Sequence, residues 1–311
     1  MNQDWDLIIV GGGPAGLSAA QYAARANLQV LLIEEMALGG QGLTIEFLEN
    51  YPGVSEPVDG FEFAQRMEKQ ARDFGAEILN TSVRGFRKEG NRFILDTGKG
   101  EFRALSVILS TGAKHRKLGI PGEDAFSGKG VSYCATCDGP FFRNKKMLVV
   151  GGGDAACDEA MFLSKLTDRV VMVHRKDRFR AQKALADRVM ENPRIEVRFS
   201  TVAEEIQGSE KVNKVVLKNL ETGETVTEEF AAVFIFVGSI PQTGLVPDLP
   251  KDEGGYILTD QNMCTEIPGL YAAGDVRATP FRQVVVAAGE GAVASHCAAQ
   301  YIDEIRGQVY S

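Results

Sequence analysis

Two cysteines separated by two residues, Cys134 and Cys137, are the side chains best suited to chemistry in this sequence. A Cys-x-x-Cys pair can act as a redox dithiol, as half of a four-ligand metal site or as a short structural disulfide. Asp138 follows the second cysteine and could accept and return a proton during thiol–disulfide exchange. The surrounding sequence is needed to distinguish these three roles.

The rest of the sequence gives little support to a metal site or a structural disulfide. A closed zinc site needs four ligands, but the chain has no second Cys-x-x-Cys pair, and its other cysteines and its three histidines are scattered. A disulfide that closes so short a loop adds little stability, and five cysteines are an odd number for a secreted disulfide scaffold. We therefore interpret the pair as redox-active and expect a cytoplasmic protein.

Two glycine-rich segments flank the cysteine pair and follow one plan. In each, a short apolar run typical of a strand buried on both faces precedes the glycines, and a run typical of a helix follows them. The first copy comprises Leu7–Val10, Gly11-x-Gly13-x-x-Gly16, Leu17–Ala26 and Val30–Ile33, and the second comprises Met147–Val150, Gly151-x-Gly153-x-x-Ala156, a helix through Leu166 and Val170–Val173. Such glycines allow a tight turn and close approach of the backbone to a pyrophosphate at a helix N-terminus. The repeat predicts two dinucleotide sites.

The residue that ends the second strand distinguishes the two sites. Glu34 lies 18 residues after Gly16, and His174 lies 18 residues after Ala156, so the two residues occupy the same register. A glutamate can bind the free ribose hydroxyls of FAD. The corner that begins at His174 is basic and contains Arg175, Lys176 and Arg180. Such cations suit the 2′-phosphate of NADPH, although a charge run is often only a solvated loop.

A third segment, Gly269–Asp275, contains a predicted strand that is followed by the acidic residue Asp275. Asp275 could bind the ribityl chain of a flavin, and the nearby Arg282 and Gln283 could face its ring or its pyrophosphate.

Each copy continues into a predicted small β-meander. The first meander is expected from Arg92–Leu95, a turn at Gly98–Gly100 and Leu105–Leu109, and the second from Val212–Leu217, a turn at Thr222-Gly223 and Ala232–Val237. The chain beyond Gln242 has no third glycine-rich opening, so we expect it to complete the first domain. The predicted fold is α/β, with two Rossmann-like three-layer domains that each carry an inserted meander. Residues 114–242 form the domain inserted, through two crossing strands, into the domain formed by 1–113 and 243–311.

Composition and charge argue against some classes of binding partner and location. The 311 residues carry a net charge of −8, which argues against nucleic acid because phosphate binding needs a basic surface. No apolar run approaches the roughly 18–20 residues that span a bilayer, so we expect no membrane segment. Met1–Asp6 contains two acids and no base, which is untypical of a signal peptide.

Taken together, the motifs resemble those of the low-molecular-weight, bacterial-type thioredoxin reductases over essentially the whole chain. The matching strings are Gly11–Gly16, Gly39-Gly40-Gln41, Glu49–Gly53, Cys134–Gly139, Gly151–Ala156, His174–Lys176 with Phe179–Ala181, and Gly274–Val276 with Arg282-Gln283. The resemblance implies a homodimeric FAD enzyme that reduces thioredoxin with NADPH. It also implies that Cys137 is the sulfur on the flavin side, that Cys134 attacks the thioredoxin disulfide, and that Asp138 assists proton transfer.

The predicted site residues form three groups. The catalytic residues are Cys134, Cys137 and Asp138. The FAD contacts are Gly11, Gly13, Pro14, Ala15, Gly16, Glu34, Gly40, Gln41, Asn50, Gly112, Asp275, Arg282 and Gln283. The NADPH contacts are Gly151, Gly153, Asp154, Ala155, His174, Arg175, Lys176 and Arg180. No metal ligand is predicted.

One departure from the family pattern concerns the electron donor. The phosphate-binding pair in the family is more often Arg-Arg, whereas this chain has Arg175-Lys176, and lysine keeps the charge but lacks the planar fork of arginine. Two alternatives stay open. One is an enzyme of the same fold that uses NADH or ferredoxin, and the other is a redox-sensing binding protein that does not turn over.

Overall fold

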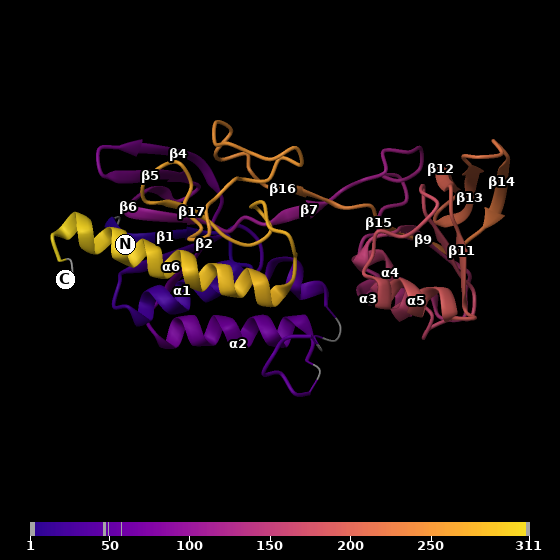
Figure 1. The fold of residues 1–311 in the computed structure, drawn as a ribbon, viewed down its shortest axis with the longest axis horizontal. Helices are drawn as coiled ribbons and strands as arrows, with labels where there is room; N and C mark the ends of the chain where they lie inside the picture. Colours follow the sequence, from indigo (N-terminus) through magenta and orange to yellow (C-terminus); the bar gives the residue numbers. More distant parts are fainter. Residues whose placement is uncertain (1–3, 46–47, 49, 57, 309–311) are drawn as a thin grey trace. The chain divides into compact units, whose positions relative to one another are not determined.

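A computed structural model describes residues 4–45, 48, 50–56 and 58–308, but not the side chains of Thr44 and Cys137. The chain divides into two compact units (Figure 1). The first unit is Met1–Lys114 with Ile240–Ser311, and the second unit is His115–Ser239. These boundaries lie one and three residues from the domain boundaries predicted at 113/114 and 242/243.

The first unit is built around a largely parallel sheet. Its elements are β1 (Asp4–Val10), α1 (Pro14–Arg25), β2 (Val30–Glu34), η1 (Gly40–Thr44), α2 (Gly60–Asp73), β3 (Glu77–Asn80), β4 (Val83–Glu89), β5 (Arg92–Thr97), β6 (Gly100–Leu109), β17 (Leu270–Ala272) and α6 (Val284–Arg306). Strands β3, β2, β1, β6 and β17 are neighbours in that order and run parallel. The strand order reverses direction between β1 and β6, and α/β sheets bind ligands at the carboxyl ends of the strands at such a point.

Both faces of this sheet are buried, as the apolar strand sequences predict. Leu7 and Ile9 of β1 pack into a core with residues of α1, α2 and α6, whereas Ile8 and Val10 pack into a second core with the meander β4–β6. Figure 1 shows the three helices on one side of the sheet and the meander on the other. The first unit therefore has three layers, and the end of β1 is held rigidly from both sides.

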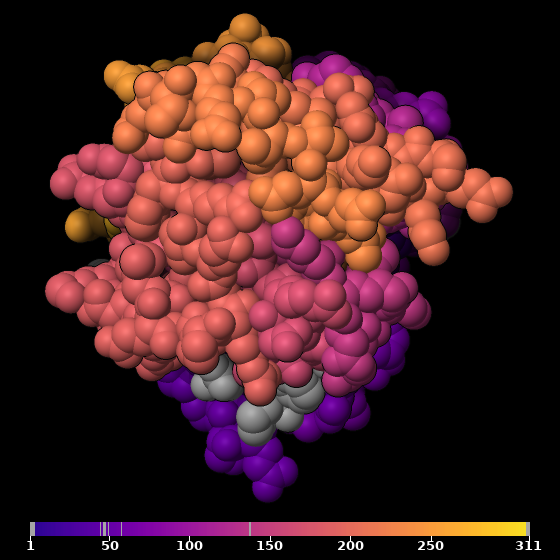
Figure 2. Space-filling model, turned by 90° about the vertical axis from the view of Figure 1, so that its right-hand side faces the viewer, coloured from indigo at the N-terminus to yellow at the C-terminus, as the bar shows by residue number. Residues whose placement is uncertain are grey.

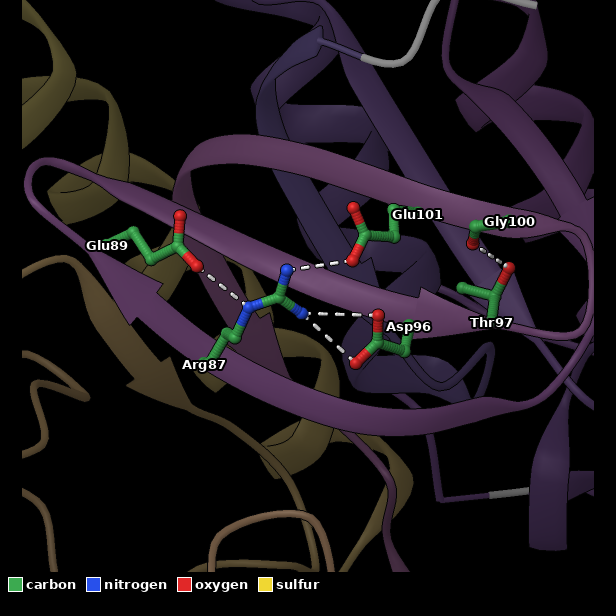
Figure 3. Close-up of polar contacts among 6 residues, drawn as sticks. All are labelled: Arg87, Glu89, Asp96, Thr97, Gly100 and Glu101. Atoms are coloured by element: carbon green, nitrogen blue, oxygen red, sulfur yellow. Dashed lines mark hydrogen bonds and ion pairs between the residues drawn. The ribbon is translucent and has the colours of Figure 1, made fainter.

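Exposed charges tie together the strands of the first meander. Arg87 of β4 donates to Glu89 at 2.9 Å, to Asp96 of β5 at 3.2 Å and to Glu101 of β6 at 2.7 Å (Figure 3). The Thr97 hydroxyl donates to the Gly100 carbonyl at 2.8 Å and closes the turn between β5 and β6. Because the side chains of this network are exposed, we expect it to align the strands more than it stabilises the fold.

The second unit repeats the plan. Its elements are β8 (Val131–Ser132), α3 (Ala135–Asp138), η2 (Gly139–Phe142), β9 (Met147–Gly151), α4 (Asp154–Leu163), β10 (Val170–Val173), α5 (Lys183–Glu191), β11 (Ile195–Arg198), β12 (Thr201–Gly208), β13 (Val212–Asn219), β14 (Thr225–Glu229) and β15 (Ala232–Phe236). The parallel sheet has the order β11-β10-β9-β15-β8, and β12-β13-β14 form a separate antiparallel sheet. Met147 and Val149 of β9 face the helices, and Leu148 and Val150 face the meander. Most of the face visible in Figure 2 belongs to this unit.

The structure confirms the predicted fold class and corrects the strands of both meanders. In the first, Leu105–Leu109 of β6 belongs to the parallel sheet beside β1, and β4, which was not predicted, forms the meander with β5 and the start of β6. Ala232–Phe236 is a strand of the parallel sheet, paired with β9, and not a strand of the second meander. The meander consists instead of β12, β13 and β14, of which only β13 was predicted as a meander strand. The mostly polar, exposed sequence of Thr225–Glu229 lacks the apolar alternation that marks a strand.

Two further strands carry the chain between the units. These strands, β7 (Ala113–His115) and β16 (Ser239–Pro241), pair with each other as a two-stranded sheet. No described helix combines the length and apolarity that a bilayer-spanning segment needs.

Candidate functional site

The first glycine loop leaves β1 and enters α1 by close backbone contacts. Gly11 has a φ of +105°, and a Cβ there would lie 2.3 Å from the Ser110 carbonyl oxygen. A Cβ on Gly16 would lie 1.9 Å from the Gly11 oxygen, so no other residue fits. A Cβ on Gly13, in contrast, would meet no atom within 4 Å. Gly13 is also the N-cap of α1 and provides no side-chain cap, so the helix N-terminus is open to an anion.

Glu34, at the end of β2, supports this loop from the neighbouring strand. Its Oε2 accepts a hydrogen bond from Gly12 N at 2.6 Å, and its Oε1 accepts one from Met36 N at 2.8 Å. A carboxylate has about four acceptor positions, so these two bonds leave room for ribose hydroxyls. A Cβ on Gly12 would come within 3.2 Å of the Glu34 Cβ. The carboxylate thus fits a dinucleotide ribose and also fixes the loop.

The C-terminal part of the first unit reaches the same loop. A Cβ on Gly274 would lie 2.9 Å from the Ala15 Cβ, and one on Gly291 would lie 2.1 Å from the Ala15 oxygen. Glu290 of α6 accepts from Gly274 N at 2.8 Å and pairs with the buried Arg277. Asp275 is therefore held beside the first turn of α1, where burial raises the pKa of its carboxyl group and the Arg282 charge opposes that rise.

The other predicted FAD contacts also lie in the first unit. Asn50 donates to Gln283 at 3.1 Å, although their sequence positions are far apart. Arg282 stacks on the Tyr256 ring at 3.9 Å, Gln41 donates to the Ala113 carbonyl, and Gly112 has a φ of +66°. Gly40 is close to the loop as well, because its Cβ would lie 3.3 Å from the Gly13 Cα. Glu49, which belongs to one of the matching strings, lies outside the described residues.

The second glycine loop repeats these contacts with a different supporting residue. A Cβ on Gly151 would lie 2.4 Å from the Phe236 oxygen, and one on Gly153 would meet no atom within 4 Å. A Cβ on Gly152 would lie 2.4 Å from the imidazole ring of His174. His174 is only 6% exposed, and burial and the neighbouring cations lower the pKa of its imidazole. The structure thus places His174 under the loop as a neutral support, and its predicted contact with NADPH stays a prediction.

The cationic residues that follow His174 are exposed beside this loop. Arg175, Lys176 and Arg180 are all accessible, and Arg180 N donates to the Gly152 carbonyl at 2.7 Å. Asp154, in the first turn of α4, accepts from Gln182 N at 2.7 Å, and Ala155 beside it is exposed. The loop and the basic corner therefore form one surface that fits a phosphorylated dinucleotide.

The cysteine pair lies in the same unit as this basic corner. Cys134 is disulfide-bonded, whereas Cys157, Cys264 and Cys297 are free; the side chain of Cys137 lies outside the described residues. Ser132 Oγ accepts from Cys134 N and donates to Cys134 O, both at 3.0 Å. The short helix α3 packs on α4, and its Ala135 is fully buried in the core that includes Ala156.

Among the described side chains, which do not include that of Cys137, no group of three or more histidine, cysteine or acidic side chains is placed to hold a metal ion. Burial raises the pKa of the Cys157 thiol to about 12, so this thiol stays protonated at neutral pH.

Sequence comparison identifies the family. The family model described as pyridine nucleotide-disulphide oxidoreductase matches residues 5–291, which include both glycine loops and the cysteine pair. The chain belongs to the pyridine nucleotide-disulphide oxidoreductase family.

Similar members of this family are thioredoxin reductases. The chain is 57% identical to the enzyme of Treponema pallidum (strain Nichols) over 98% of this chain and 100% of that protein. It is 43% identical to the enzyme of Peptoclostridium acidaminophilum over 97% of this chain and 98% of that protein. The crystal structure of Lactococcus lactis thioredoxin reductase matches with a TM-score of 0.91 and 42% identity, over 96% of this chain and 99% of that chain.

Sequence inspection missed several residues that position the site. Glu290 and Arg277 hold the Asp275 turn, and Ser110 Oγ donates to the carbonyls of Val10 and Gly11 at 3.0 and 2.8 Å. The sequence could have indicated Glu290, because it is the one acidic residue among the small and apolar residues that begin α6.

The contrast between Gly13 and Gly16 gives a test of the first loop. In Gly13→Ala, the methyl group enters space that is open in the protein but close to a bound pyrophosphate. We expect the flavin-free protein to keep its stability while its dissociation constant for FAD rises about tenfold or more. In Gly16→Ala, the methyl group clashes with the Gly11 oxygen. We expect the free energy of unfolding of the flavin-free protein to fall by about 1–3 kcal/mol.

Fluorescence titration with FAD and chemical unfolding of the flavin-free protein measure the two effects. If Gly13→Ala binds FAD with unchanged affinity, this loop is not the pyrophosphate site.

Proposed function

We propose that this chain is a thioredoxin reductase that takes electrons from NADPH and delivers them to the disulfide of thioredoxin. The observation that carries the proposal is the disulfide-bonded Cys134, which lies in a unit that also contains a glycine loop with an exposed basic corner. The other glycine loop, with its acidic corner Glu34, lies in the first unit. One chain thus combines two dinucleotide sites with one redox disulfide.

The two loops would hold different cofactors. The open space at Gly13, the acceptor positions of Glu34 and the buried Asp275 suit FAD. The open space at Gly153 and the exposed cations of the basic corner suit NADPH. When bound, these two groups supply hydride transfer, which protein side chains cannot provide.

The cysteine pair would carry the electrons to the protein substrate. The Cys134–Cys137 disulfide gains two electrons and two protons and opens to two thiols. The Cys134 thiolate then attacks one sulfur of the thioredoxin disulfide, which forms a mixed disulfide and releases the other thioredoxin sulfur. Cys137 next attacks Cys134, which restores the internal disulfide and releases the second thioredoxin sulfur. The released sulfurs take up protons, so thioredoxin gains two electrons and two protons in all.

Asp138 would handle a proton in this exchange. It is the last residue of α3 and is partly exposed, and its backbone N–H donates to the Cys134 carbonyl at 3.2 Å. A carboxylate next to the flavin-side sulfur can return a proton to whichever thiolate leaves.

We further propose that the protein is a cytoplasmic homodimer. The sparse and odd set of cysteines supports the location, and the family resemblance supports the assembly. Light scattering of the purified protein would distinguish a dimer from a 33.7 kDa monomer.

Removing either sulfur should abolish thioredoxin reduction. For Cys134→Ser and Cys137→Ser, we expect turnover of thioredoxin to fall by more than about a thousandfold, because the covalent step is lost. Reduction of ferricyanide by NADPH, which needs only the flavin, should persist. Cys297→Ser removes a free thiol in the first unit and is the matched control. Wild-type turnover by either variant would refute the mechanism.

Removing the cations should weaken the binding of NADPH selectively. For Arg175→Ala and Lys176→Ala, we expect KM for NADPH to rise about tenfold each, because each change deletes a charge-assisted contact with the 2′-phosphate. KM for NADH should stay within about twofold. Arg178→Ala, an exposed arginine of the same corner, is the control. A wild-type preference for NADH, or equal losses with both donors, would contradict the phosphate assignment.

A further inference from the structure

A buried carboxylate lies in the segment that joins β7 to β8 in the second unit. Glu123 is only 1% exposed. Its two oxygens accept hydrogen bonds from Leu118 N at 2.9 Å, from Gly119 N at 2.6 Å and from the Tyr133 hydroxyl at 2.7 Å. A buried carboxylate is costly unless donors surround it, and these three hydrogen bonds offset that cost.

Tyr133 links this carboxylate to the redox pair. It immediately precedes Cys134, and burial and the bond to Glu123 raise the pKa of its phenol, which therefore stays a protonated donor. On its ring lies the imidazole of His115, with a centroid distance of 5.9 Å and an interplanar angle of 15°. His115 is the last residue of β7, through which the chain enters the second unit. Burial lowers the pKa of His115, so the stacked ring is neutral at pH 7.

The backbone of Cys134 is thus fixed on its N-terminal side by two side chains. Ser132 Oγ bonds to both its N–H and its carbonyl, and the neighbouring Tyr133 is anchored through its phenol to Glu123. The Glu123 segment packs closely on β12, because Ile206 N donates to the Pro121 carbonyl at 2.9 Å and a Cβ on Gly122 would lie 1.9 Å from the Ile206 oxygen.

We propose that Glu123 and Tyr133 are positioning residues that hold Cys134 in the geometry of its disulfide and of its attack on thioredoxin. The inference rests on the proposed function, since it assigns to Cys134 the role of redox sulfur. Two thiols that are held close have a high effective concentration, which favours their disulfide over the open dithiol. Loosening Cys134 should therefore make the disulfide easier to reduce and slow the attack on thioredoxin.

Tyr133→Phe tests this with the smallest change, because it removes only the hydroxyl and keeps the ring against His115. Wild type and variant holoenzyme are equilibrated with glutathione redox buffers, and the fraction of free Cys134 is measured by alkylation and mass spectrometry. We expect the dithiol–disulfide equilibrium to shift about tenfold towards the dithiol, which corresponds to a potential about 30 mV higher. Turnover with thioredoxin should fall by a similar factor.

Two comparisons separate positioning from a general loss of stability. Flavin reduction by NADPH, followed by stopped flow, should stay within about twofold in Tyr133→Phe. Tyr271→Phe removes a more deeply buried phenol, which donates to the Cys297 carbonyl at 3.0 Å in the first unit, and should leave the dithiol equilibrium unchanged. Glu123→Gln should shift the equilibrium in the same direction as Tyr133→Phe, and the double variant should add little to Glu123→Gln alone.

An unchanged equilibrium in Tyr133→Phe, or an equal shift in Tyr271→Phe, would overturn the inference. The glutathione titration needs neither NADPH nor thioredoxin. A wild-type protein that does not turn over thioredoxin would therefore refute the proposed function, while the titration would still decide the role of Tyr133.

Discussion

In each unit, the side chain that ends the second parallel strand lies against the middle glycine of the nucleotide loop. Glu34 bonds to Gly12 N, and the His174 ring occupies the space that a Cβ on Gly152 would need. This contact fixes the loop while the adjacent Gly13 and Gly153 keep open the space that a pyrophosphate requires. We propose that the same corner also selects the ligand, because it holds the carboxylate of Glu34 in one unit and is followed by exposed cations in the other. In this proposal, loop geometry and cofactor choice are coupled through one position of the fold.

The redox pair depends on this arrangement indirectly. Helix α3, which begins directly after Cys134, packs on α4, the helix that starts at the second glycine loop. The cysteine and the basic corner therefore belong to one unit, whereas the acidic corner and Asp275 belong to the other unit. Two paired strands, β7 and β16, are the covalent connections between the units. The contact between His115, at the end of β7, and Tyr133 joins the connecting segment to the residue that precedes Cys134, whose sulfur we propose attacks thioredoxin.

Much of this could be predicted from the sequence because it depends on local pattern. The apolar runs, the glycine spacing and the shared register of Glu34 and His174 predicted both parallel sheets and both loops. Sequence could not show that His174 faces the loop, because a strand-end residue can point either way and only packing decides. The bond from Tyr133 to Glu123 was missed because it joins two irregular segments, where neither helical nor strand periodicity predicts a contact. Strand β14 was missed because its exposed residues are polar, so its pairing with β13 alone defines it.

We expect this chain to couple a bound flavin to a redox-active disulfide. An anaerobic titration of the purified holoenzyme with dithionite, followed by the flavin absorbance and by alkylation of Cys134, measures this coupling. Full reduction should consume one two-electron equivalent for the flavin and a second for the disulfide, and Cys134 should become alkylated. Consumption of a single equivalent per flavin, with Cys134 still protected, would contradict this expectation, and so would a purified protein that binds no flavin.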